Sequence, residues 1–143
     1  MIARNPEDLG VAADPELQPE AVYPHLEIAF ELLRQGDNEG AKAAGERAVA
    51  LAPGLFAAHN ALGRALVELG ELERGTSELE TAVRLAPDSP EMHYSLVRAY
   101  TKAGRADDAA RERVAFAELE RKRRVQRGEP GVDSPGDKER RPQ

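Results

Sequence analysis

One spacing of 34 residues recurs along most of this chain, and it limits the folds that the chain can adopt. The three histidines keep this spacing: His25, His59 and His93. A column of glycines keeps it too: Gly36, Gly70 and Gly104. The tripeptide Leu51-Ala52-Pro53 returns 34 residues later as Leu85-Ala86-Pro87. A fixed period of this length indicates one supersecondary unit repeated several times, with each copy packed only against its neighbours.

The middle copy has the pattern of two helices joined by a tight turn. Its first apolar stripe has helical spacing: His59, Leu62, Gly63 and Leu66. Its second stripe has the same spacing: Leu72, Gly75, Leu79, Ala82 and Val83. Gly70 lies between them, where the chain must leave the helix through a left-handed conformation, and Pro87 ends the second helix. Small residues at Gly63 and Gly75 predict that the two helices approach each other closely.

These residues resemble the signature of the tetratricopeptide repeat. The matching pattern is His59-x-x-Leu62-Gly63-x-x-Leu66, then Gly75-x-x-x-Leu79 and Pro87, with His in the tryptophan column and Leu in the tyrosine column. The resemblance implies an all-α, right-handed α-solenoid of three helix-turn-helix repeats with a long C-terminal capping helix. Gly45 and Arg113 stand where the family has a large apolar residue, which predicts looser packing of the flanking second helices.

The periodicity divides the chain into five segments: 1–21, a loop or weak helix; 22–55, 56–89 and 90–127, the repeats; and 128–143, a disordered tail. The last repeat lacks the terminal proline, so its second helix is expected to run from near Arg105 to about Arg127. Phe116 replaces the small Ala48 and Ala82 of the inner copies. A bulky ring at this position predicts that the helix is an end cap. Whether the sequence belongs to a longer repeat array stays open.

Composition excludes several classes of function. The net charge of −6 argues against general binding of nucleic acids. The chain has no cysteine, hence no disulfide or thiol chemistry, and no apolar run approaching the ~20 residues of a membrane span. The sequence has no cysteine nucleophile, no glycine-rich phosphate loop and no HExxH motif, and no other catalytic set is recognisable. We therefore expect a cytoplasmic protein that is not an enzyme and needs no cofactor. We expect it to bind a protein or peptide, with an acidic partner as a hypothesis.

The histidine column invites a metal hypothesis, which geometry rejects. Zinc needs its ligand nitrogens about 2.0–2.1 Å from one ion. Equivalent residues of stacked helix pairs are separated by about a helix diameter, roughly 10 Å. We therefore expect each histidine to pack in its own repeat, and no metal site.

The resemblance implies that the first helix of each pair lines a concave groove that holds a peptide or a helix. The candidate groove residues are Tyr23, Leu26, Phe30, Leu33, Asn60, Arg64, Val67, Tyr94, Arg98 and Thr101. The hypothesis is that affinity comes from the apolar end, near Phe30, while Arg64 and Arg98 select an acidic partner. An equal alternative is that residues 1–21 fold back over this apolar end.

The first helix is apolar on two faces, and a helix of this kind is normally buried. We assign one stripe to packing within the repeats: His25, Ile28, Ala29 and Leu32. We assign the other to the groove: Tyr23, Leu26, Phe30 and Leu33. Something is expected to cover this second face.

Two alternatives concern the C-terminal helix. A structural role is conceivable, with self-association into a homodimer through Phe116 and Leu119, although a monomer is the preferred expectation. The run Arg121 to Arg127 holds five cations in seven residues. Cations are favoured at the C-terminus of a helix by its dipole. The rival interpretation is weak binding of nucleic acid or another acidic partner.

Overall fold

The computed structural model describes residues 21–129, which contain six α-helices and no strand. The helices are α1 (Val22–Gln35), α2 (Asn38–Leu51), α3 (Phe56–Glu68), α4 (Leu72–Leu85), α5 (Pro90–Lys102) and α6 (Ala106–Gln126). The expected loop over most of 1–21 and most of the expected tail over 128–143 lie outside the described residues. The long last helix is confirmed, since α6 has 21 residues against 13 or 14 in the others.

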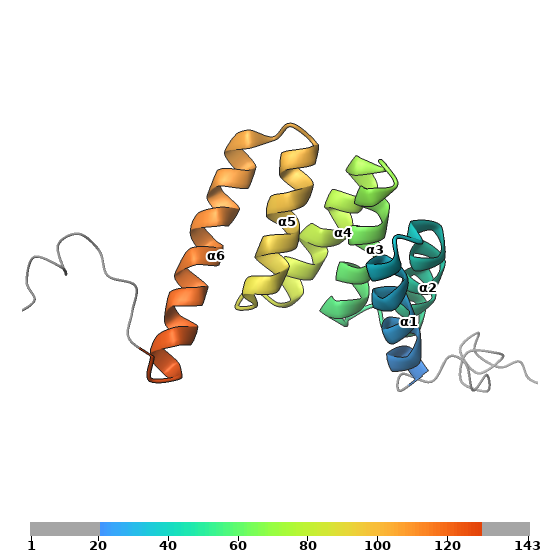
Figure 1. Cartoon of the computed structure of the whole chain (residues 1–143), viewed down its shortest axis with the longest axis horizontal. Coiled ribbons are helices and arrows are strands. Elements are labelled where there is room, and N and C mark those ends of the chain that lie inside the picture. Colours follow the sequence, from blue (N-terminus) through green and yellow to red (C-terminus); the bar gives the residue numbers. More distant parts are fainter. Residues whose placement is uncertain (1–20, 130–143) are drawn as a thin grey trace, which may run out of the picture.

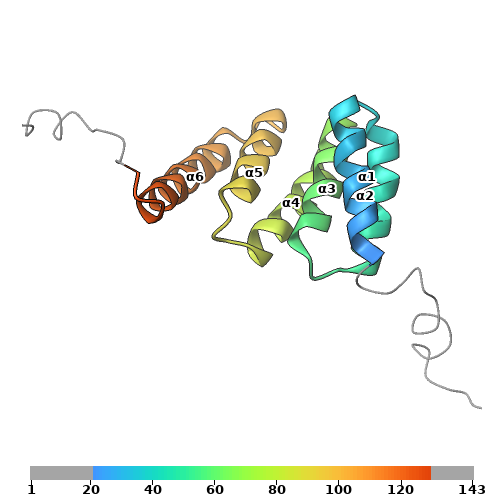
Figure 2. The ribbon, with the colours of Figure 1, turned by 60° about the horizontal axis from the view of Figure 1, so that its bottom comes forward.

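The helices form antiparallel pairs that follow one another along the long axis of the molecule (Figure 1). α1 packs on α2, α3 on α4 and α5 on α6, while α2 also packs on α3 and α4 on α5. Figures 1 and 2 show that α1 and α6 lie at opposite ends of this array. The expected all-α solenoid is therefore present. None of the described helices is both long and apolar enough to cross a membrane.

Each helix pair turns through the same glycine-centred motif. Gly36, Gly70 and Gly104 have φ angles of 85°, 87° and 75°, in the left-handed region that favours glycine. The amide of the residue after each glycine donates to a carbonyl five residues earlier. These bonds are 2.9 Å from Asp37 to Leu32, 2.9 Å from Glu71 to Leu66 and 2.8 Å from Arg105 to Tyr100. The predicted turn is thus confirmed in all three copies.

Glycines inside the helices mark the places where backbones touch. A Cβ atom at Gly75 would lie 2.9 Å from the Val67 amide nitrogen and 3.0 Å from the Gly63 carbonyl oxygen. The predicted close approach of α3 and α4 is therefore confirmed. Gly45 differs from its expectation: a Cβ there would lie 2.9 Å from the Leu62 Cα. Gly45 lets α2 and α3 approach closely, so its lack of a side chain does not loosen this contact.

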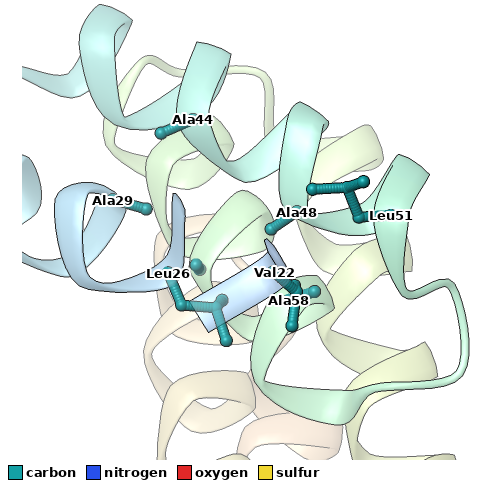
Figure 3. Close-up of a cluster of buried hydrophobic side chains, with 8 residues drawn as sticks. Val22, Leu26, Ala29, Ala44, Ala48, Leu51 and Ala58 are labelled. Carbon is teal, nitrogen blue, oxygen red and sulfur yellow. The ribbon is translucent and has the colours of Figure 1, made fainter. Parts of the chain in front are cut away.

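Two clusters of buried apolar side chains form the core. The first joins α1, α2 and α3 through Val22, Leu26, Ala29, Ala44, Ala48, Leu51, Ala58 and Ala61 (Figure 3). The second joins α3 to α6 through Val67, Leu79, Leu96, Ala99, Tyr100 and Ala109. Ala109 is the only buried residue of α6, because this last described helix packs mainly on α5. The looser packing expected around Arg113 stays a prediction.

The assignment of the two faces of α1 was wrong for two residues. Leu26, expected in the groove, is only 6% exposed and belongs to the first cluster, whereas Ile28, expected to pack between repeats, is 50% exposed. The physical reason is the order of the repeats. Leu62 is covered by α2 of the preceding pair, as the close approach at Gly45 shows. α1 begins the described array, so no preceding helix among residues 21–129 covers Ile28.

Candidate functional site

A hollow of about 810 Å³ lies along the first helices of the three pairs. α1, α3 and α5 supply most of its wall, and α6 closes one side. Seven of the ten residues proposed from the sequence line it: Phe30, Leu33, Asn60, Arg64, Val67, Tyr94 and Arg98. The structure thus brings together side chains that are up to 68 positions apart in the sequence.

The other three proposed residues do not line the hollow. Leu26 is buried in the core. Tyr23 is 58% exposed on the first turn of α1, away from the hollow. The Thr101 hydroxyl donates a 2.8 Å hydrogen bond to the Val97 carbonyl of its own helix.

The end of the hollow near α1 is apolar. Phe30 and Leu33 are half-buried there, and the buried side chain of Val67 on α3 also lines the hollow. The guanidinium carbon of Arg64 lies 5.7 Å from the centre of the Phe30 ring, within the range of a cation–π contact. This end can therefore accept an apolar group while holding a positive charge at its edge.

Two arginines lie near the middle of the hollow, and their surroundings differ. Arg98 donates a 3.4 Å hydrogen bond to Glu68, which also forms a 3.2 Å ion pair with Lys102. Arg64 makes no ion pair within 4.0 Å with any described residue, and its guanidinium group packs on the ring of Phe30. Burial lowers the pKa of Arg64, the charge of Arg98 lowers it further, and the charge of Glu68 partly opposes this shift. The guanidinium group still carries its charge at neutral pH, because arginine starts from a value far above 7.

Phe116 of α6 also lines the hollow, although it was not among the residues predicted from the sequence. The ring lies beside Tyr94, with centroids 5.6 Å apart and planes at 44°. The signal was present, since Phe116 replaces a small residue of the inner copies and Tyr94 stands on the groove face. What the pattern did not reveal is that the two rings meet. Phe116 is half-buried in this contact, and the homodimer alternative through Phe116 and Leu119 stays a prediction.

The far end of the hollow is acidic, but its carboxylates are paired. Arg123 donates to both oxygens of Glu91, at 2.8 and 3.2 Å, and lies 3.8 Å from Glu120. The Arg123 hydrogen bonds lower the pKa of Glu91 to about 2. Arg127 pairs with Glu129 at 2.6 Å. Two cations of the basic run are thus engaged with carboxylates of this chain.

Asn60 is a buried polar residue in the wall of the hollow. It is 5% exposed, and its Oδ1 atom has no hydrogen-bond partner among the described residues. A buried carbonyl oxygen without a partner costs free energy, about 1–3 kcal/mol in protein mutants. The Oδ1 atom of Asn60 is therefore an unusual feature, because nearly all buried polar atoms of folded proteins have a hydrogen-bond partner.

Two of the three histidines in the column, His59 and His93, link helices to loops. His59 bridges Glu78 of α4 and the Pro53 carbonyl, and His93 bridges Glu112 of α6 and the Pro87 carbonyl. Each ring therefore ties its helix pair to the loop that enters it. Among residues 21–129, no group of three or more His, Asp or Glu side chains is arranged to hold a metal ion.

Comparison with known proteins supports the repeat. The family model described as tetratricopeptide repeat matches residues 32–93. No curated protein matches the chain in sequence. The MamA RS-1 ArsTM double mutant is 27% identical with a TM-score of 0.67, over 76% of this chain and 61% of that chain. A Thermobaculum terrenum O-GlcNAc transferase mutant is 26% identical with a TM-score of 0.66, over 71% of this chain.

This chain spans only 20% of the transferase structure and less than two thirds of the MamA mutant. A crystal structure of MamA, at 22% identity, covers 87% of this chain with a TM-score of 0.63 and shares the fold. The helix pairs, their glycine turns and these neighbours agree with one another. Residues 32–93 therefore belong to the tetratricopeptide repeat family, and the chain folds as a helical solenoid of that kind.

Proposed function

We propose that this chain is a non-catalytic interaction module that holds a segment of another protein in the hollow along α1, α3 and α5. Three repeats, residues 22–55, 56–89 and 90–127, would present the hollow. The observation that carries the proposal is the hollow itself, with about 810 Å³ of space and a lining shared by three helix pairs. Tetratricopeptide repeats are in general binding scaffolds, so the fold supports the same conclusion.

The lining favours a peptide or helix over a small polar molecule. Half-buried Phe30 and Leu33 form one wall, and the Tyr94–Phe116 pair forms another. Completing the burial of one large apolar side chain contributes about 1.5–3 kcal/mol at most. Exposed ion pairs contribute about 0.2–1 kcal/mol each. We therefore assign most of the affinity to the apolar walls.

Selection of a displayed random-peptide library on the intact chain tests the proposal. The recovered peptides are synthesised, and their Kd is measured for the parent chain and for Phe30→Asp. Phe30 lines the hollow, so an aspartate there is expected to weaken binding at least about tenfold, because it places a charge on the apolar wall.

Val114→Asp is the matched control. Val114 is also apolar and 59% exposed, but it lies on α6 and does not line the hollow. Binding to this variant is expected to match the parent. Peptides that bind all three proteins equally well, with each protein folded by circular dichroism, would contradict the proposed groove.

A further inference from the structure

We propose that Arg64 is the receptor for one acidic side chain of the bound segment, and that large apolar residues of the same segment lie on both sides of that carboxylate. This inference rests on the proposed function, because it concerns the occupant of the same hollow. It adds the chemistry that the occupant must carry at one position.

The charged residues that line the hollow are all in ion pairs within the chain, except Arg64. Five charged residues line the hollow: Arg64, Glu68, Glu91, Arg98 and Glu120. Four of them form ion pairs within the chain, Glu68 with Arg98 and Lys102, and both Glu91 and Glu120 with Arg123. Arg64 alone has no carboxylate within 4.0 Å among the described residues, although the charge of Glu68 acts on it from a longer distance. A half-buried cation without a direct ion pair is complementary to an anion that arrives with the partner.

The carboxylates of α1 do not pair with Arg64. Arg64 also borders a smaller hollow of about 490 Å³, which Glu27 and Glu31 line. Glu31 is already engaged by Arg34 and by Gln35, the latter at 2.8 Å. Glu27 is exposed and makes no ion pair with Arg64. Instead, Arg64 packs against the ring of Phe30, which fixes the guanidinium group without neutralising it.

Arg64 lies between the two apolar walls of the hollow. It belongs to α3, which lies between the first helices of the neighbouring pairs (Figure 2). Phe30 and Leu33 continue the wall on the α1 side, and Tyr94 and Phe116 continue it on the far side. A segment that covers both walls must pass over Arg64 rather than end there. The complementary anion is therefore a side-chain carboxylate within the segment, not a terminal carboxylate.

Asn60 lies one helical turn before Arg64, on the same face of α3. Its amide oxygen has no partner in the described chain, although its side chain borders the hollow. Rotation of the terminal amide would let it bond to a backbone N–H of the segment. Asn60 and Arg64 would then hold the backbone and the acidic side chain of the same residue or of adjacent residues.

Three pools of terminally blocked octapeptides test the inference on the intact chain. Each has Leu or Phe on both sides of a central position and Ala or Ser elsewhere; the central residue is Glu, Gln or Lys. The Glu pool is expected to bind at least about tenfold more tightly than the Gln pool, because it alone gives a charge-assisted bond to Arg64. The Lys pool is expected to bind least.

Two variants locate the preference. Arg64→Gln is expected to abolish the difference between the Glu and Gln pools. Arg84→Gln is the control, at an exposed arginine of α4 that does not line the hollow, and it is expected to keep the difference within about threefold. A measurement on the parent chain avoids any folding defect: the Arg64 Nε–H NMR signal is expected to shift with the Glu pool and not with the Gln pool.

The outcomes separate this inference from the proposed function. Equal binding of the Glu and Gln pools by the parent chain would overturn the role of Arg64 and leave the groove supported. Failure of every pool to bind would overturn both. Binding that requires an unblocked C-terminus would overturn the side-chain carboxylate in favour of a chain end.

Discussion

His59 Nδ1 and Glu78 Oε1 lie 2.7 Å apart, joining α3 to α4, and the same relationship recurs 34 residues later between His93 and Glu112 at 2.6 Å. The other ring nitrogen lies 2.6 Å from the Pro53 carbonyl in the first case and 2.7 Å from Pro87 in the second. Each ring therefore links the second helix of its pair to the loop that precedes the first helix.

The His59–Glu78 pair is expected to stabilise the fold measurably. Both partners are largely buried, with 11% and 23% of their side chains exposed. A double-mutant cycle with His59→Ala and Glu78→Ala is expected to give a coupling of about 0.5–3 kcal/mol in the free energy of unfolding. Urea denaturation of the parent, both single variants and the double variant measures it. Strictly additive effects would show that the two side chains do not stabilise each other.

Gly45→Ala is expected to destabilise the chain, against the usual preference of helices. Replacing a glycine inside a helix by alanine normally gains about 0.5–1 kcal/mol. At Gly45 the new methyl group would lie 2.9 Å from the Leu62 Cα, which belongs to a backbone that cannot move away alone. Overpacking of this kind costs about 1–3 kcal/mol. Thermal unfolding should therefore show a lower Tm.

Gly54→Ala is the control for that substitution. A Cβ at Gly54 would meet no atom within 4 Å, so its effect is expected to stay within about 0.5 kcal/mol. A Gly45→Ala variant as stable as the parent would mean that α2 and α3 do not approach as closely as described.

The Glu91–Arg123 pair predicts a local dependence on pH. The folded chain holds the pKa of Glu91 at about 2, below the ordinary value of 4.5. Because the folded value is the lower one, the stabilisation is present above pH 4.5 and is lost as the pH falls towards 2. An NMR titration of the Glu91 carboxyl carbon should have its midpoint near 2. In Arg123→Gln the midpoint should rise towards 4.5, and in Arg121→Gln, a neighbouring exposed cation, it should stay low.

Much of this fold could be predicted from the sequence because its repeats are in phase. The glycine column predicted the turns, and the small residues Gly63 and Gly75 predicted the contact of α3 with α4. The missing proline at Arg121 predicted the length of α6. In each case a local rule, such as positive φ or the lack of a Cβ, fixes the structure whatever surrounds it.

The end of the array was harder to predict. The columns assign Ile28 and Leu62 the same environment, but Leu62 is covered by a preceding helix and Ile28 is not covered by any described one. A repeat pattern carries no information about which neighbours are missing. The same limit applies to the arginines, which look equivalent in the sequence. The structure distinguishes them, because Arg98 pairs with Glu68 whereas Arg64 packs on the ring of Phe30.

The contact between Tyr94 of α5 and Phe116 of α6 predicts that these two rings stabilise the packing of α6 on α5. Phe116→Ala removes an aromatic contact of about 0.5–1.5 kcal/mol together with part of the burial of a large ring. We expect a loss of about 1–3 kcal/mol in the free energy of unfolding, and no change in the mass measured by light scattering. Val114→Ala, on an exposed part of α6, should change neither. If instead the parent is a dimer that Phe116→Ala converts to a monomer, the ring lies in an interface and not in the hollow.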